Sequence, residues 1–309
     1  MLNQVVAVLL GTVLLLSVNA KAGVFNMFRS KPYPEAFFSG QLLAVAEAIK
    51  KQDIEKAKQL AEKLPDIDAP GAEHFTLLAF AVADTNIPAI KMLMALGADP
   101  ATKLGSQGQN GSVAYFAMWR KTTDALKAML ESGMDPNLTD DGGNALIFHA
   151  PRLEGNNSLK LLVDYGANVD ARDSLGQTPL LDILNTRFDE VLFLLEHGAD
   201  PFVMDKSGMT AAYSVQESLN SIDKSTEAYQ KMLKIQQKMI AMGVKFPALT
   251  PYGERFRNDI VYCKEPRGYR ARSECKVEGV HSFIEPQSEE SKRADEKILR
   301  ERYGIDAKL

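Results

Sequence analysis

The sequence predicts an all-α fold built from repeated units, and two landmarks that recur along the chain support this prediction. A glycine-centred loop returns at residues 97, 133, 166 and 198, at intervals of 36, 33 and 32 residues. A second landmark, a Thr, Ser or Ala followed by apolar residues, returns at residues 76, 112, 145, 178 and 210. Two independent landmarks that keep one register indicate an internal repeat.

The best preserved unit carries the signals of two short helices. Thr178 is a suitable N-cap, and Pro179 suits the first helical position, where a missing N–H costs nothing. Apolar residues follow at helical spacing in 180–184 and again in 191–195. Gly198 then predicts a C-cap with positive φ. One unit is too small to bury its own stripes, so we expect about six units to stack into one elongated core.

These residues resemble the ankyrin repeat family. Gly176-Gln-Thr-Pro-Leu180 and Val191-Leu-Phe-Leu-Leu-Glu-His-Gly-Ala-Asp-Pro201 follow the family consensus, although Thr-Pro-Leu-His is nowhere intact. The resemblance covers about residues 41–246. It implies a solenoid of stacked helix–turn–helix units joined by β-hairpin loops, in which hairpin tips and inner-helix ends line a concave binding face.

The ends of the repeat region are less regular. The first unit is rich in Lys and Glu, with helices expected near 41–50 and 53–63, and is interpreted as a solvated N-terminal cap. The interval between Thr210 and Gly243 is 33 residues, against 20 or 21 in other units. This difference indicates an insertion around residues 218–225.

Residues 1–20 are interpreted as a signal peptide. The stretch has no charged side chain, and its apolar run of about 14 residues spans only ~21 Å as a helix, too short for a ~30 Å hydrocarbon core. Ala20 or Ala22 supplies a small residue for cleavage. Basic residues follow the run instead of preceding it, which leaves a short N-terminal membrane anchor as the alternative. Export, together with the resemblance to bacterial exported ankyrin proteins, predicts a periplasmic protein.

Residues 247–309 fall outside the repeat. Residues 255–276 carry seven basic side chains against three acidic ones, and Cys263 and Cys275 enclose much of this basic turn. In an exported protein the two cysteines predict a disulfide that stabilises the fold by ~3 kcal/mol. In the cytoplasm they would be ordinary thiols.

The chain ends in a predicted charged helix over residues 288–303, capped by Ser288 and ended by Gly304. Its few apolar residues suffice to dock on the solenoid end and not to make a core. We interpret residues 247–309 as a C-terminal cap, with a positively charged contact for an acidic partner as the alternative.

The sequence contains no recognisable catalytic, metal-binding or cofactor motif. Gly-x-Ser-x-Gly, His-Glu-x-x-His and phosphate-loop patterns are absent, and each of the four histidines has an ordinary explanation. A net charge of −4 and a pI near 5.7 argue against nucleic acid as a partner. We therefore expect no enzyme, no metal, no cofactor and no small-molecule substrate.

The candidate binding residues lie where this family varies. Trp119 and Arg120 end the inner helix of the third unit, and Trp and Arg are common interface hot spots. The alternative for Trp119 is packing against the neighbouring repeat. Arg152 occupies the equivalent position one repeat later. The remaining candidates are the hairpin-tip residues Asp141, Arg172, Asp173 and Asp205.

The resemblance implies a protein partner and a monomer when free. The most specific expectation is an immunity protein that occludes a secreted toxin, for example an antibacterial lipase effector of a type VI secretion system. A second possibility is an envelope stress-protective or scaffolding protein that binds an enzyme without inhibiting it. A third is a cytosolic or membrane-anchored scaffold, which follows if the N-terminus is retained.

Overall fold

The computed structural model of the chain describes residues 32–105, 111–150, 157–264 and 288–309. The chain divides into two compact units. Unit 1 comprises residues 1–142 and 152–167, and unit 2 comprises residues 143–151 and 168–309. The expected signal peptide, Arg152 and Cys275 lie outside the described residues, so these predictions stay untested.

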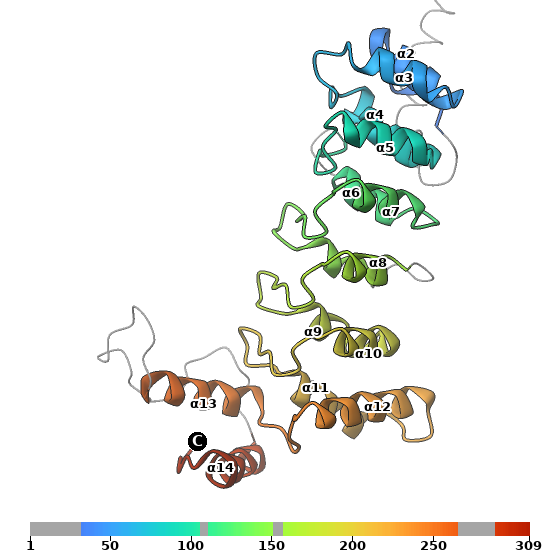
Figure 1. Ribbon diagram of the computed structural model, residues 1–309. Helices are drawn as coiled ribbons and strands as arrows, with labels where there is room; N and C mark the ends of the chain where they lie inside the picture. The colour runs from blue at the N-terminus through green and yellow to red at the C-terminus, as the bar shows by residue number, and fades with distance from the viewer. Residues whose placement is uncertain (1–31, 106–110, 151–156, 265–287) are drawn as a thin grey trace, which may run out of the picture. The chain divides into compact units, whose positions relative to one another are not determined.

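Unit 1 is a stack of helix pairs (Figure 1). α4 packs against α2, α5 and α6, and α5 packs against α3 and α7. All eight residues of α4 are buried because other helices cover it on several sides. The elements of unit 1 are η1 (Pro34–Ala36), α2 (Gly40–Lys50), α3 (Ile54–Ala61), η2 (Ala72–His74), α4 (Leu77–Asp84), α5 (Ile87–Ala95), α6 (Val113–Met118), α7 (Asp124–Glu131) and α8 (Ser158–Asp164).

An aromatic cluster joins the start of unit 1 to its interior. Phe37 and Phe75 have ring centroids 4.6 Å apart, and Phe38 meets Phe80 edge-on at 5.7 Å. Phe75 in turn meets Phe116 of α6 edge-on at 6.1 Å. Aromatic pairs at these distances add to the free energy gained by burying their surface. The two helices predicted for the first unit are confirmed as α2 and α3, whereas the aromatic cluster was not predicted.

The recurring glycines end the outer helices as predicted. At the end of α5, Gly97 has φ +92°, its N–H donates to the Met94 carbonyl, and Ala98 N–H donates to the Leu93 carbonyl, both at 3.0 Å. This pair of bonds is the Schellman motif, which satisfies two of the last helical carbonyls. Gly198 has φ +90°, and the prediction of a C-cap there is confirmed.

Carboxylates then link successive loops of unit 1. Asp99 N–H donates to both carboxylate oxygens of Asp68, at 3.0 and 3.1 Å, and Asp99 itself accepts from Ala101 N–H at 2.8 Å. Burial raises the pKa of Asp68, the hydrogen bond from Asp99 N–H lowers it, and the carboxylates of Asp99 and Asp66 raise it. In unit 2 the same link recurs between Asp200 N–H and the Asp170 carboxylate, at 2.9 Å.

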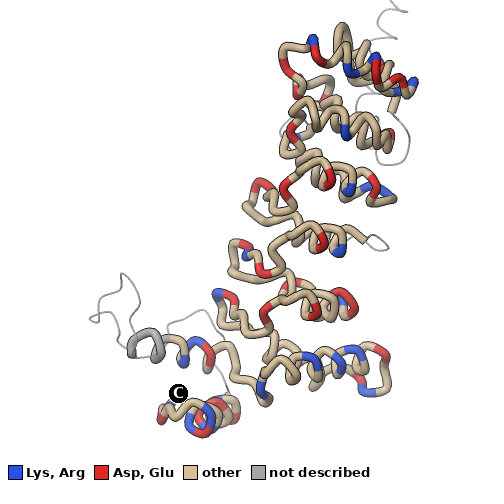
Figure 2. The backbone as a smooth tube through the Cα atoms, viewed as in Figure 1, with Lys and Arg blue, Asp and Glu red and all other residues tan. Residues whose placement is uncertain are grey.

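Unit 2 continues the pairing of helices. α9 packs against α10 and η3, and α12 packs against α10 and α11. Figure 2 shows Lys and Arg spaced along α12, with acidic residues among the loops. The expected insertion near 218–225 falls at the end of a long α11 and the loop after it. The elements of unit 2 are η3 (Leu146–Phe148), α9 (Pro179–Ile183), α10 (Phe188–Glu196), α11 (Ala211–Ser221), α12 (Glu227–Ala241), α13 (Pro251–Lys264) and α14 (Glu289–Tyr303).

The C-terminal extension differs from its prediction in two respects. Residues 251–264 form the helix α13, so the first half of the expected basic turn is helical and Cys263 lies in that helix. The extension also makes a small core, where the sequence predicted none. Seven side chains form it because α13, α14 and the chain end fold on one another: Leu249, Phe256, Ile298, Leu299, Ile305, Ala307 and Leu309. The predicted helix α14 is confirmed, with Ser288 as N-cap and Gly304 as C-cap.

A buried carboxylate holds α13 and α14 together. Asp295 of α14 is 1% exposed and accepts from the backbone N–H of Thr250 at 3.0 Å and from its hydroxyl. The Thr250 hydroxyl oxygen accepts from Gly253 N–H at 3.2 Å in the first turn of α13. A Cβ at Gly253 would lie 2.5 Å from the Asp295 carboxylate, so the helices meet where only glycine leaves room.

Two further expectations differ from the structure. The described residues contain no sheet, and the expected β-hairpins reduce to turns with isolated antiparallel bridges at Lys103–Ser112 and Met204–Thr210. Asx turns and glycines close these loops, so a ladder of strand hydrogen bonds is not needed. The expected inner helix of the fourth unit is the 3₁₀ turn η3, with His149 as its C-cap.

Asn86 should contribute more to stability than an ordinary N-cap. Its side-chain oxygen accepts from Ala89 N–H at 3.1 Å, and its amide nitrogen donates to the Ile49 carbonyl of α2 at 2.9 Å. Asp53 caps α3 through a single exposed bond from Lys56 N–H. We expect Asn86→Ala to lower the free energy of unfolding by about 2–3 kcal/mol and Asp53→Ala by about 1 kcal/mol. Urea unfolding followed by circular dichroism measures both, and equal losses would contradict this assignment.

Candidate protein-binding site

Trp119 lies exposed at the end of an inner helix of unit 1. It is the C-cap residue of α6, and 48% of it is exposed. Its ring centroid lies 5.8 Å from that of Tyr115, one turn earlier in the same helix. Trp119 thus packs against its own helix and leaves about half of its surface open to a partner, as the binding interpretation requires.

Arg120 is tied to the preceding repeat. Its Nη2 donates to the carbonyl oxygen of Ala83 in α4 at 2.8 Å, and its guanidinium lies 5.6 Å from the centroid of the Phe116 ring. Burial lowers the pKa of the Arg120 guanidinium, and the nearby carboxylate of Asp84 opposes that shift. Arg120 therefore has a structural role, and its predicted role as a partner anchor stays a prediction.

A row of charges follows the ends of three successive inner helices. Lys50 of α2 pairs with Asp84 of α4, with Nζ and Oδ1 2.8 Å apart, and Asp84 is only 6% exposed. Asp84 in turn lies within electrostatic reach of Arg120 after α6. We call Lys50, Asp84, Tyr115, Trp119 and Arg120 the helix-end surface. Its charged groups hold one another in place beside an exposed indole.

Asp141 is the candidate hairpin-tip residue of unit 1. Asp141 is exposed and forms an ion pair with Lys103 of the preceding loop. Both side chains are more than half exposed, so the pair adds little stability and leaves both charges accessible. The structure does not bring Asp141 into the helix-end surface by any described contact, and its binding role stays a prediction.

In unit 2, Arg172 and Asp173 hold the loops in shape. Arg172 Nη1 donates to the carbonyl of Gly176 at 2.9 Å and to that of Met204, in the next loop, at 3.0 Å. Asp173 accepts from the backbone N–H groups of Leu175 and Gln177, at 2.9 and 2.8 Å. Both side chains therefore have local structural partners.

Asp205 does not display its carboxylate at a hairpin tip. It is 7% exposed, and one carboxylate oxygen accepts from Ser207 N–H, from the Ser207 hydroxyl and from Met209 N–H, at 2.6 to 2.9 Å. The turn folds over its own aspartate because that oxygen satisfies two backbone donors at once. The expectation that Asp205 faces a partner is corrected accordingly.

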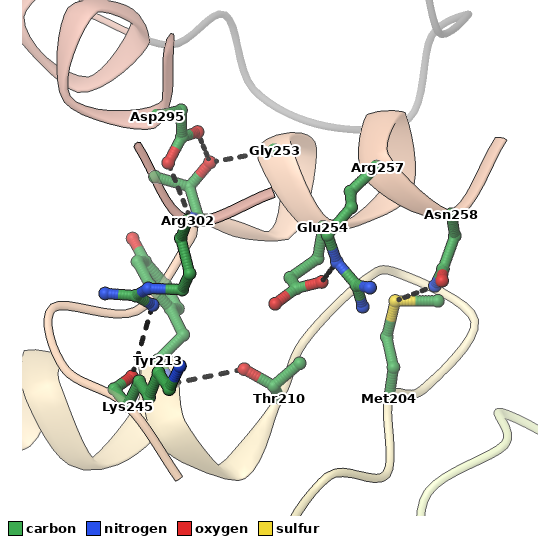
Figure 3. Close-up of polar contacts among 11 residues, drawn as sticks. Met204, Thr210, Tyr213, Lys245, Gly253, Glu254, Arg257, Asn258, Asp295 and Arg302 are labelled. Carbon is green, nitrogen blue, oxygen red and sulfur yellow. Dashed lines mark hydrogen bonds and ion pairs between the residues drawn. The ribbon is translucent and has the colours of Figure 1, made fainter. Parts of the chain in front are cut away.

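Unit 2 contains a groove that was not predicted from the sequence. A cavity of about 680 Å³ lies between the loop of residues 200–204, the segment 243–249 and the helices α13 and α14. Figure 3 shows side chains of α13 directed toward the loop that carries Met204. Asn258 approaches the Met204 sulfur at 3.2 Å, and a Cβ at Gly208 would lie 2.2 Å from the Pro251 carbonyl. The extension is thus seated directly on the last repeats.

No group of three or more His, Cys, Asp or Glu side chains that could hold a metal ion occurs in the part of the chain that the structure describes. Within the same residues, no helix combines the length and the apolar character needed to cross a membrane.

Comparison with known proteins supports ankyrin repeats in this chain. Residues 114–212 match the family model described as ankyrin repeats in three copies. An ankyrin repeat-containing protein of Treponema pallidum is 30% identical over 134 residues, which are 42% of this chain and 43% of the relative. The chain therefore spans less than half the length of that relative.

The chain is also similar to solved structures. The ankyrin repeat domain of Bcl-3 is 24% identical, with a TM-score of 0.52, over 65% of this chain and 86% of that domain. One chain of a complex between a predatory endopeptidase from Bdellovibrio bacteriovorus and an immunity protein is 21% identical, with a TM-score of 0.45, over 62% of this chain and 97% of that chain. Residues 114–212 thus carry ankyrin repeats, and the described residues are mostly helical and contain no sheet.

Substitutions of Asp205 test whether this residue stabilises its own turn. Asp205→Ala removes the acceptor of three hydrogen bonds and should lower the free energy of unfolding by about 1–3 kcal/mol. Asp205→Asn keeps an acceptor oxygen in the same place, so its loss of unfolding free energy should be less than half of that of Asp205→Ala. Urea unfolding measures the difference, and hydrogen exchange at Ser207 and Met209 localises it. Unchanged stability in Asp205→Ala would contradict the structural role.

Proposed function

We propose that this protein is a non-enzymatic module that binds another protein through its helix-end surface. Ankyrin repeats are generally non-catalytic protein-interaction domains, and their presence in this chain supports a binding function. The observation that carries the choice of surface is the exposure of Trp119, 48% open beside a fixed row of charges.

The physical chemistry of the helix-end surface suits recognition. A half-exposed indole offers a large apolar area to a partner, and burying it on association gives a favourable free energy. Trp119 is held against Tyr115, so little side-chain freedom is lost when a partner covers it. The neighbouring Lys50–Asp84 pair and Arg120 favour one orientation of a partner over others.

The finer proposal is an immunity protein of the periplasm. In this proposal the protein binds a secreted toxin, for example an antibacterial lipase effector of a type VI secretion system, and covers its active site. The charge-free apolar stretch in residues 1–20 supports export, and the exposed Trp119 supports a partner-binding face. A second proposal, an envelope scaffold or stress-protective protein, has the same binding surface and leaves the captured enzyme active.

Trp119→Ala tests the surface. With wild-type protein as bait, an envelope fraction of the producing cells should yield a partner that the variant binds at least tenfold more weakly, because truncating a hot-spot Trp costs about 2 kcal/mol or more. Tyr165→Ala is the matched control, since Tyr165 is also an aromatic C-cap residue, at the end of α8, and is 37% exposed. Quantitative mass spectrometry followed by affinity measurement with the purified partner gives the result.

The outcomes separate the proposals. Loss of the captured enzyme's activity on binding supports the immunity function, and retained activity supports the scaffold. A partner that binds Trp119→Ala and wild type equally well would contradict the helix-end surface.

Export has its own test. We expect the mature N-terminus to begin just after Ala20 or Ala22, and Cys263 and Cys275 to resist alkylation until a reductant is added, because a disulfide persists in an oxidising compartment. Intact-mass analysis of the purified protein, with and without reductant, measures both. An intact Met1 together with two free thiols would exclude the periplasmic proposal and favour a membrane-anchored or cytosolic scaffold.

A further inference from the structure

The groove of unit 2 is positively charged. Its lining carries four cations and two carboxylates: Arg172, Lys245, Arg257, Arg302, Asp200 and Glu254. Glu254 is committed to Arg257, with Oε2 and Nε 2.7 Å apart, and the Asp200 carboxylate accepts from Phe202 N–H at 2.8 Å. Arg172 and Arg302 donate to backbone carbonyls, which satisfy N–H donors without neutralising the charge.

The same groove has an apolar wall. Phe202 and Tyr303 both line it and are 59% and 40% exposed, and they are two of only seven large hydrophobic residues that are exposed in the described part of the chain. Val203, Met204 and Leu249 continue the wall. A volume of about 680 Å³ is enough for several side chains of a peptide, since ligand sites commonly measure ~300–1,000 Å³.

The cations of the groove lie next to its apolar wall. Figure 3 shows Arg302 reaching from α14 to the Lys245 carbonyl and Arg257 held beside Glu254 on α13. Arg302 Nη1 lies 3.4 Å from that carbonyl oxygen, and the Arg257 guanidinium lies 5.0 Å from the centroid of the Tyr303 ring. A ligand that fits has an apolar side chain for the wall and a carboxylate within reach of Lys245 and Arg302.

We propose that the groove is a second docking site, which binds a segment of a partner protein where acidic residues flank a large apolar side chain. The proposal rests on the protein-binding function proposed above and assigns it a separate contact in unit 2. The carboxylates of such a segment complement the net positive lining, and its aromatic or aliphatic side chain covers Phe202 and Tyr303.

A phage-displayed library of random 12-residue peptides tests the proposal on the full chain. Selection should enrich sequences that combine Asp or Glu with Phe, Leu, Tyr or Trp. For an enriched peptide, Lys245→Glu should reduce the affinity about tenfold or more, and Phe202→Ala about fivefold or more, by fluorescence anisotropy. Both residues are exposed, so these variants should fold normally.

Matched controls lie outside the groove. Lys234→Glu makes the same charge change on the exposed face of α12, and Leu175→Ala truncates an apolar side chain that is 60% exposed. Both should leave the peptide affinity unchanged. The same peptide with Asn and Gln in place of its acidic residues should bind at least tenfold more weakly to wild type.

The groove and the helix-end surface are tested separately because Trp119→Ala should leave the peptide affinity unchanged. Enrichment of basic sequences only, or affinities that Lys245→Glu and Phe202→Ala do not alter, would overturn the groove proposal and leave the helix-end surface standing. Groove-dependent peptides together with a partner insensitive to Trp119→Ala would overturn the helix-end surface alone.

Discussion

The helix pairs of the described repeats are too small to bury their own apolar stripes, and the rest of the structure depends on that constraint. All eight residues of α4 are buried, and α2, α5 and α6 supply the cover. In such a stack, stability is the sum of unit terms and of contacts between neighbours. The loops between helices consequently have to satisfy their backbone N–H and C=O groups by local hydrogen bonds. Glycines with positive φ and Asx turns perform this function at each level, as Gly97 and Asp99 show.

Because most side chains of the helices and loops contact neighbouring repeats, only a few large apolar side chains in the described residues stay exposed and available to a partner. The contrast between Trp119 and Arg120 shows the division. These residues are adjacent in sequence, yet the first leaves half its surface open and the second binds the carbonyl of Ala83. In unit 2 the groove exists because a non-repeat extension contacts the last repeats through Ala248 and Asn258 and leaves a space beside them.

The sequence predicted the features that local chemistry determines. Thr178 and Ser288 cap their helices through hydrogen bonds to residues three positions later, and Gly198 follows the end of α10 with a positive φ, so a short window of sequence suffices to find them. The roles of the candidate binding residues were harder to predict because they depend on residues distant in sequence. Nothing near Arg120 in sequence signals Ala83, nothing near Met204 signals Arg172, and the walls of the groove come from segments more than 90 residues apart. Asp205 was misread because a turn aspartate and an exposed one have the same local pattern.

The charge row of unit 1 also limits how this protein can be shortened. A stack of repeats is often treated as modular, with terminal units removed at will. Here the carboxylate of Asp84 is almost fully enclosed, and one of its cations, Lys50, belongs to the preceding repeat. Removing that repeat would take away a countercharge along with the cover over α4, and an enclosed carboxylate that loses a cation is strongly disfavoured. The first repeat and the next one therefore form an electrostatically inseparable pair, and a minimal fragment has to begin before α2.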